Sequence, residues 1–479
     1  MEQLTAGEWA SEQVKRAPSF AVAAAIITAL LIISAFIEYA PAEEEPKWTG
    51  TEAAIAKPDP PPKKIKKLIQ PEKPEFKPNP DVPIVEDSVP VDAPIEDMTF
   101  DVPITSDPIN EAVEPKDPFP MDLSKKMAVI GTSPGTGGFK GALGNRSRGR
   151  RRSAGRRYGM PRDTDKWIRA GLLWLKKVQE PDGSWNAQKW GGAGNCDAAV
   201  TGLALLAFLG FGCTDKAPAE FKGTVKKAVN YLVQREKNGG FGERMYTQGI
   251  CTMALAEAYG MRIGGRPVRD SAQAAIDFVC RSQGSNGGFG YNGPGDDTSV
   301  TGFNFQALKA GVTAKLRVPS IALERAEKYL KASLNSNGSS PYRVPNPNGT
   351  LPMTAAMLTG RLFLGHSATA PDSLLQARWL TNGNQHAQVG KAVNHLYSTY
   401  YLSLSMFQMG GKFWTSWRDA FVMPLRGKQE KAGPNRGSWP NAGFAYGGHG
   451  GRVYTTTMAI LSLEVAWRYQ RGTRTRRSK

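Results

Sequence analysis

The chain has 479 residues, and its 61 lysines and arginines exceed its 43 acidic residues, which gives a net charge of +18. This length is greater than that of one typical domain, and 4 cysteines in so long a chain do not indicate a disulfide framework. The sequence contains no Gly-x-Ser-x-Gly elbow, no phosphate loop and no dinucleotide fingerprint, so nothing supports a serine hydrolase or a common nucleotide-binding fold.

The N-terminal segment has the pattern of a membrane anchor. After a tail over residues 1–19, residues 20–38 contain an uncharged apolar run that is long enough to cross a bilayer as a helix. Lys15 and Arg16 precede this run and acidic residues follow it, so the tail is expected in the cytoplasm and the rest outside. The alternative is a cleaved signal peptide, since residues 40–42 loosely resemble a cleavage site. We therefore expect a single-pass inner-membrane protein with its C-terminal domain in the periplasm.

Two low-complexity segments follow the anchor. Residues 39–130 are rich in proline and charged residues, which favours a semi-rigid polyproline II tether or solvated disorder. Residues 131–160 are rich in glycine and then in arginine, and the run Arg146 to Arg157 is interpreted as an anion-binding arm. The candidates are an anionic lipid or cell-wall surface and the chain's own acidic linker. No nucleic acid is expected, because no recognition fold accompanies the arginines.

Residues 161–470 repeat one unit about every fifty residues, and residues 471–479 form a basic tail. Each unit predicts an amphipathic helix, a glycine-rich loop and a helix that is apolar on every side. The six apolar helices are expected at Cys196–Gly210, Tyr246–Gly260, Asp297–Gly311, Met353–Gly365, His395–Gly410 and Val453–Trp467. Six such hairpins close naturally into two concentric rings, with the apolar helices inside. The fold class is therefore all-α, an (α/α)6 toroid preceded by one transmembrane helix and a disordered linker.

The first unit resembles a known motif. Its residues Arg169, Ala170, Trp174, Leu175, Gln179, Gly183 and Trp185 are similar to the QW motif of squalene–hopene and oxidosqualene cyclases. Later units keep parts of this pattern, such as Gln283 and Trp439. The resemblance implies a toroid of the terpenoid cyclase and protein prenyltransferase type, in a membrane-anchored bacterial form. It is informative about the fold and weak about the activity.

Two acidic residues are the catalytic candidates. In squalene–hopene cyclases the proton donor is the central Asp of an Asp-x-Asp-Asp-Thr motif at the mouth of an inner helix. Here Asp296 and Asp297 match the second and third acids of this motif, and Pro294 replaces the first. The alternative interpretation is that either carboxylate caps the N-terminus of the helix that follows.

No cofactor is expected, with zinc left as an open alternative. The zinc-binding histidine of the prenyltransferases corresponds to Ser398 here, and no Asp-x-Cys pair is present. A different zinc site at Cys196, Asp197 and His449 remains an alternative, because the helices that carry them are neighbours in a closed ring. Helix capping and packing explain the same residues without a metal. The four cysteines form either buried thiols or one or two disulfides.

A set of aromatic residues lies near the starts of the apolar helices. In cyclases such rings line the cavity and stabilise carbocations. The predicted ligand-cavity residues are Tyr246, Tyr291, Phe303, Tyr397, Tyr400 and Tyr454. The same rings equally serve to fill the centre of the toroid.

These observations predict a membrane-anchored envelope protein whose toroid binds a polymer, a peptide or a lipid without the chemistry of the family. The alternative is a divergent terpenoid cyclase or prenyltransferase that uses Asp296 or Asp297 as its acid. A third interpretation is a purely structural envelope spacer whose arginine arm docks to an anionic layer.

Overall fold

The computed structural model describes residues 146–382, 393–469 and 471. The expected membrane helix, the proline-rich tether and most of the basic tail lie outside these residues. No helix in the described part of the chain is long and apolar enough to cross a membrane. The described residues are mostly helical, as the repeat pattern predicts.

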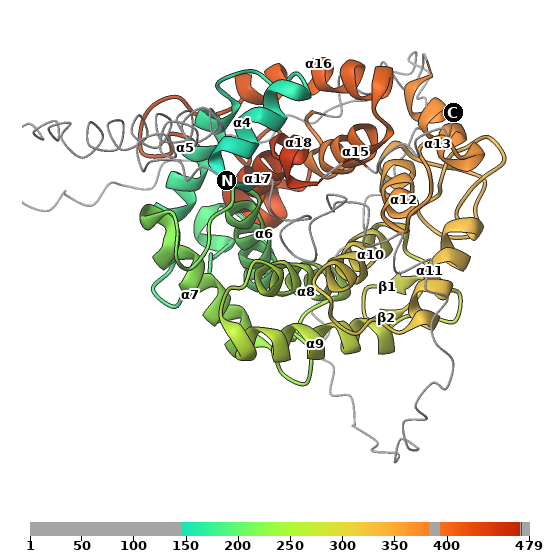
Figure 1. Ribbon diagram of the computed structural model, residues 1–479, viewed down its shortest axis with the longest axis horizontal. Helices are drawn as coiled ribbons and strands as arrows, with labels where there is room; N and C mark the ends of the chain where they lie inside the picture. The colour runs from blue at the N-terminus through green and yellow to red at the C-terminus, as the bar shows by residue number, and fades with distance from the viewer. Residues whose placement is uncertain (1–145, 383–392, 470, 472–479) are drawn as a thin grey trace, which may run out of the picture. The chain divides into compact units, whose positions relative to one another are not determined.

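Six of the helices form a closed inner ring (Figure 1). Each packs against the next along the chain, and the last packs against the first, so that the ring has no open end. These helices are α6 (Asp197–Gly210), α8 (Met245–Gly260), α10 (Thr298–Thr313), α12 (Leu351–Phe363), α15 (Leu396–Met409) and α17 (Gly447–Leu463).

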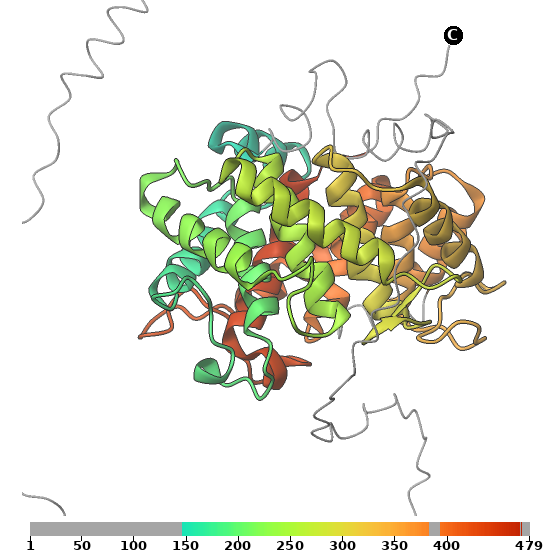
Figure 2. The same ribbon diagram turned by 90° about the horizontal axis from the view of Figure 1, so that it is seen from below.

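A second set of helices surrounds the inner ring, and each member precedes its inner partner in the chain. These outer helices are α5 (Thr164–Lys177), α7 (Ala219–Arg235), α9 (Gly265–Arg281), α11 (Ser320–Ala332), α13 (Pro371–Thr381) and α16 (Gly411–Gly427). Figure 1 looks along the axis of the two rings, and Figure 2 shows the same helices from the side. The predicted (α/α)6 architecture is therefore present in the described residues.

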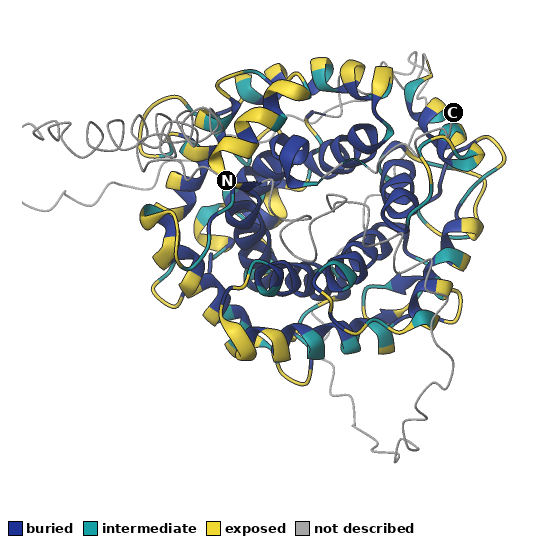
Figure 3. Cartoon of the chain, in the orientation of Figure 1, coloured by how far each residue is buried: buried dark blue, intermediate teal, exposed yellow. Residues whose placement is uncertain are grey.

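Burial separates the two rings as the apolar patterns predict. In α6 every residue after Asp197 is buried, because one face packs on the neighbouring inner helices and the other on the outer ring. The outer helices bury one face only, as in α9, where Val268 and Ile276 are buried and Arg266 and Arg269 are exposed. Figure 3 shows this contrast, with buried inner helices and an exposed outer rim.

Small residues let the inner helices approach one another closely. A Cβ atom at Gly202 of α6 would lie 2.9 Å from the Ile250 side chain of α8. A Cβ atom at Gly249 of α8 would lie 3.0 Å from the backbone of α10. Larger side chains at these positions would push the helices apart and widen the ring.

The glutamines of the repeat join each unit to the next outer helix. Gln179 donates through Nε2 to the carbonyl oxygens of Gly183, in its own loop, and Thr224, in α7, at 2.9 and 3.0 Å. Gln283 repeats this arrangement with its own loop and with Ala322 of α11. Each of these amides therefore ties the loop of its own unit to the outer helix of the next unit.

The same contact closes the ring between its two ends. Gln429, after α16, donates to the carbonyl oxygens of Gly437 and Trp167 at 2.7 and 2.8 Å, and Trp167 belongs to α5. Gly437 has φ of +92°, and a Cβ atom there would lie 2.3 Å from the carbonyl oxygen of Ala170. Glycine is therefore required at Gly437, both for its left-handed backbone and for this close approach.

Two short helices attach the ends of the described chain to the rings. Helix α4 (Arg148–Arg157) packs against α18 (Val465–Arg468), which follows α17 directly. Residues 146–157, which precede the boundary expected at residue 161, thus contact the rings. The start of α17 also differs from expectation, because the glycine-rich run 447–451 forms a helical turn that ends in a kink at Gly451.

Candidate functional site

The N-terminal ends of the inner helices meet at one face of the ring, which we call the N-terminal face. The Tyr246 hydroxyl of α8 hydrogen-bonds to Ser299 Oγ of α10, and the Tyr397 hydroxyl of α15 donates to the Ser299 carbonyl oxygen at 3.1 Å. On the other side, the Gly194 N–H before α6 donates to the carbonyl oxygen of His449 in α17 at 3.1 Å. This face is where a ligand would meet helix termini and loops.

Most of the predicted cavity rings form one cluster on the inner side of the ring. Phe303 lies at its centre, with ring centroids 6.0 Å from Tyr246, 6.1 Å from Tyr397 and 6.1 Å from Tyr400, the last in a stacked arrangement. Tyr291 extends the cluster outward through a 5.7 Å contact with Tyr246. In this arrangement the rings bury much of their area against each other.

The hydroxyl groups of the cluster are paired inside the protein. Tyr400 donates to Gln306 Oε1 at 2.7 Å, and Gln306 Nε2 donates to the Tyr401 hydroxyl at 3.0 Å. Burial raises the pKa values of Tyr246, Tyr397 and Tyr400 well above the usual value, so these phenols stay protonated. They act as neutral hydrogen-bond donors, not as bases.

Tyr454, the sixth predicted cavity residue, is on α17 and interacts electrostatically with Tyr401, whose ring packs on Phe303. It stands on α17 next to Gly450, where a Cβ atom would lie 2.4 Å from that of Tyr454. Burial raises the pKa of Tyr454, with a smaller contribution from Tyr446. The two tyrosines therefore mark the α17 side of the N-terminal face.

Asp297 caps the N-terminus of α10. Its Oδ1 atom accepts hydrogen bonds from the backbone N–H groups of Ser299 and Val300 and from the Ser299 hydroxyl, at 2.8 to 3.0 Å. These donors and the helix dipole stabilise a negative charge on the carboxylate. Asp297 is fully buried, and its Oδ2 atom has no hydrogen-bond partner among the described residues.

Asp296 faces outward and is paired. Its Oδ1 atom lies 2.5 Å from Arg343 Nη1, and its side chain is 38% exposed. Its carbonyl oxygen accepts a hydrogen bond from the Tyr329 hydroxyl at 2.8 Å. An acid for alkene protonation requires a desolvated carboxyl group, so the exposure of Asp296 does not favour that role.

The structure adds Tyr342 and Arg343, which the sequence analysis did not single out. They lie in the loop between α11 and α12, which folds back over the start of α10 so that the Thr298 N–H donates to the Tyr342 carbonyl oxygen at 2.9 Å. The hydroxyl oxygens of Tyr342 and Tyr291 lie 3.2 Å apart. Burial, with Asp297 nearby, raises the pKa of Tyr342. No local pattern in this loop indicates that it reaches the preceding unit.

The three candidate zinc ligands are neighbours in space, but their side chains have other contacts. Asp197 accepts hydrogen bonds from the Ala187 N–H at 2.9 Å and from Asn186 Nδ2 at 3.2 Å, so both its oxygens are in use. The Cys196 thiol faces the backbone carbonyl of His449 at 3.9 Å. Burial raises the pKa of Cys196 to about 11, which disfavours the thiolate that zinc binds. Across the described residues, no three His, Cys, Asp or Glu side chains form a group that could hold a metal ion.

The four cysteines are free thiols in the described structure, which is one of the two states left open above.

Ser398, which the resemblance matches to the zinc-binding histidine of the prenyltransferases, also makes hydrogen bonds to a nearby residue. Its N–H and hydroxyl group contact Nδ1 of His395, which caps α15. Burial lowers the pKa of His395, so the neutral ring is favoured and its Nδ1 atom is available as an acceptor.

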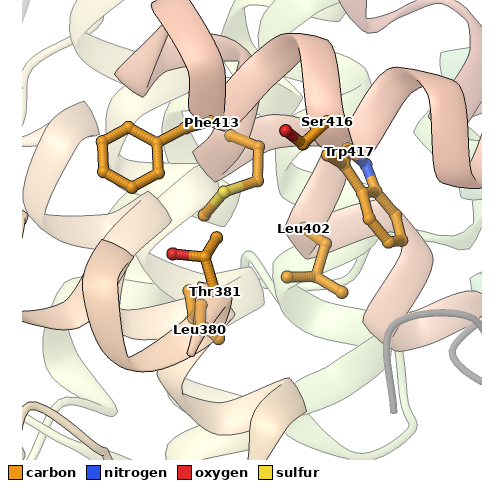
Figure 4. Close-up of a pocket in the computed structure, with 7 residues that line it drawn as sticks. Leu380, Thr381, Leu402, Phe413, Ser416 and Trp417 are labelled. Carbon is orange, nitrogen blue, oxygen red and sulfur yellow. The ribbon is translucent and has the colours of Figure 1, made fainter. Parts of the chain in front are cut away.

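A crevice between α13, α15 and α16 is too small to bind a ligand. It is lined by Leu380, Thr381, Leu402, Met406, Phe413, Ser416 and Trp417 (Figure 4). Its volume is about 10 Å³, which is roughly the space of one water molecule. We interpret it as a packing defect of the outer ring.

The opposite, C-terminal face of the ring carries a buried charge network. Glu257, at the end of α8, accepts hydrogen bonds from Arg146 at 2.8 Å and from Arg468 at 3.0 Å. Both arginines also donate to carbonyl oxygens of α6, those of Leu209 and Leu206 respectively. Although burial acts to raise it, the two arginines lower the pKa of Glu257 below its usual value. The network therefore joins residue 146 and α18 to the inner ring.

Comparisons with known proteins give low similarities. No protein-family model and no curated protein matches the chain. A type II terpene cyclase, MstE from Scytonema, in complex with geranylgeranyl dihydroxybenzoate, is 16% identical over 64% of this chain and 97% of its own, with a TM-score of 0.42. A protein from Actinoplanes is 18% identical over 64% of this chain and 99% of its own, with a TM-score of 0.43. Similarities this low carry no argument, so the architecture rests on the helix contacts described above.

Proposed function

We propose that this chain is a membrane-anchored envelope protein whose toroid binds a polymer, peptide or lipid at its N-terminal face without cyclase or prenyltransferase chemistry. Both candidate acids already make other contacts, which supports this proposal. Asp297 uses one oxygen to cap α10, and Asp296 is paired with Arg343 at the surface. The aromatic cluster packs against itself around Phe303, which suits a binding surface better than an open reaction chamber.

The binding proposal is tested on the full-length protein with three probes: purified peptidoglycan, an extended peptide library and a polyprenyl phosphate. Tyr342, half-buried at the N-terminal face, is the residue to change. Tyr342→Ala should weaken binding of one of these probes by about tenfold, because aromatic anchors dominate binding surfaces. Tyr231→Ala on outer helix α7, also half-buried, is the matched control and should leave binding unchanged. Equal affinity in both variants, or no binding of any probe, would contradict the proposal.

The alternative function is a divergent terpenoid cyclase or prenyltransferase, and one observation favours Asp297 as its acid. The Asp297 carboxylate is fully buried beside Tyr342, and together with burial it raises the pKa of that tyrosine. Incubation with squalene or a polyprenyl diphosphate, followed by mass spectrometry, tests this alternative. Asp297→Asn keeps the helix cap, because asparagine caps as well as aspartate, but it removes the acid. A product that wild type forms and Asp297→Asn does not would establish the enzyme and overturn the binding proposal.

The proposed anchor is residues 20–38, with the tether at 39–130 and the toroid in the periplasm. Wild-type protein is expected in the membrane pellet after a carbonate wash, and a chain lacking residues 20–38 is expected in the supernatant. A mature protein whose N-terminus begins after residue 42 would instead identify a cleaved signal peptide.

We propose that α4 contacts an anionic surface, through fewer arginines than the sequence alone predicts. Arg146 and Arg151 of the predicted arm are buried and hold the chain to the rings, so they are not available to a partner. The exposed arginines of this segment are Arg148, Arg150, Arg152, Arg156 and Arg157. Basic residues near an anionic bilayer contribute about 1 kcal/mol each.

Vesicle sedimentation tests this surface. The protein lacking residues 20–38 is expected to bind phosphatidylglycerol vesicles and not phosphatidylcholine vesicles. Changing the five exposed arginines to glutamine should abolish binding. The control changes Lys222, Lys226 and Lys227 of α7, also exposed, and should retain binding. Loss of binding in both variants would show that net charge alone is responsible.

A further inference from the structure

Lys309 is a buried amine without a partner. It lies on inner helix α10, it is 4% exposed, and its Nζ atom has no hydrogen-bond partner in the described structure. The other buried basic side chains among the described residues, Arg146, Arg151, Arg361 and Arg468, each have acceptors. Burying a polar group without a hydrogen bond costs several kcal/mol, so an amine left this way points to a group that binds there.

The position of Lys309 on α10 places it toward α12 and α15. Two helical turns earlier, at Gly302, a Cβ atom would contact the Tyr401 hydroxyl of α15 and Ala356 of α12. Residues seven apart share one side of a helix, so Lys309 stands on the same stripe. One turn earlier, Gln306 is satisfied by Tyr400 and Tyr401, so it does not pair with the amine.

Burial makes the Lys309 amine easier to deprotonate than an exposed lysine. Burial lowers the pKa of Lys309 to about 7 and is the sole cause of this change. No titratable group on α8, α9 or α12, or elsewhere in the described residues, contributes to it. Burial therefore favours the neutral amine, and an arriving anion would favour its protonated form.

We propose that Lys309 binds the carboxylate of a long-chain apolar acid whose chain lies against the inner helices. A carboxylate supplies the charge-assisted hydrogen bonds that the amine lacks. The surrounding inner helices are apolar, and Phe305, one turn earlier on α10, is buried, which suits a hydrocarbon chain. This site is separate from the N-terminal face and does not depend on the function proposed there.

Native mass spectrometry of the full-length protein, released from detergent, tests this inference with oleate and methyl oleate as probes. Wild type should bind one oleate per chain, at least about tenfold more tightly than the ester, because a hydrogen bond to a charged group is lost in the ester. Above pH 7 the apparent Kd for oleate should rise by about tenfold per pH unit, because binding takes up one proton.

The variant Lys309→Met tests whether oleate binding depends on Lys309. Lys309→Met should bind oleate at least about tenfold more weakly, and its thermal stability should be equal or higher, because an unpaired buried charge is removed. Lys315→Met, at an exposed site after α10, should bind like wild type. Equal binding of oleate and its ester by wild type, or no oleate binding, would overturn the inference without need of any variant. Activity or ligand binding at the N-terminal face would be unaffected by either result.

Discussion

Asp297 matches a catalytic motif and also caps a helix. The acid motif and a helix cap both need a carboxylate just before an inner helix, so the sequence pattern is the same for both. The structure shows that Oδ1 caps α10 and leaves Oδ2 buried without a partner. The cap uses Oδ1 alone, so an acid role for the other oxygen is the question that Asp297→Asn tests.

Gln429 provides a test of ring closure at the level of one side chain. Gln429→Ala should lower the free energy of unfolding by about 1 to 3 kcal/mol, because the carbonyl oxygens of Gly437 and Trp167 each lose a hydrogen bond. The measurement is urea unfolding followed by circular dichroism. Gln188→Ala, at an exposed position, should change stability by less than about 0.5 kcal/mol. If the two variants behave alike, the ring does not depend on this contact.

Glu257 provides a test of the buried charge network. Glu257→Gln removes the carboxylate that Arg146 and Arg468 share and should lower stability at pH 7 by about 3 to 5 kcal/mol. The pKa of Glu257 is lowered in the folded state, so its contribution is present above the usual value of 4.5. It is lost as pH falls through the lower folded value. Unfolding curves of wild type and variant should therefore converge in acid, and a constant difference would contradict the assignment.

At the scale of single elements, α4 differs most from its sequence-based interpretation. Seven arginines in a short run indicate a solvated arm, yet Arg151 is 6% exposed and lies 3.8 Å above the ring of Phe211. Its Nε atom is 3.0 Å from Asp165 of α5. The run therefore contains an amphipathic helix whose buried side is itself basic, which hydrophobic patterns do not detect.

Hydrogen exchange tests the attachment of α4. Arg151→Met should raise the exchange rate of amides in residues 148–157 by about tenfold or more, because the helix loses its ion pair and its bonds to the carbonyl oxygens of Arg146 and Phe211. The inner helices should keep their protection. Arg152→Met, on the exposed side, is the control. Unchanged exchange in Arg151→Met would show that α18 packing alone holds the helix.

At the scale of the whole toroid, closure of the helix ring determines the radius of gyration. A fragment of residues 146–471 should have a radius of gyration of about 20 Å by small-angle X-ray scattering, the value for a compact domain of this length. Six hairpins stacked as an open superhelix would give a larger value and a pair-distance distribution with a long tail. A fragment that begins at residue 161 lacks Arg146 and α4, and it should unfold at lower urea concentration.

The sequence by itself determined the number of hairpins, the order of amphipathic and apolar helices, and the all-α class. It could do so because helix periodicity and glycine-rich turns are local properties, repeated six times along the chain. Tertiary structure decided which helices touch, that Gln429 reaches Trp167 across the ends of the ring, and that Arg146 pairs with Glu257. It also decided which side chains remain unpaired, such as Lys309, because burial and partners depend on segments that are distant in the chain.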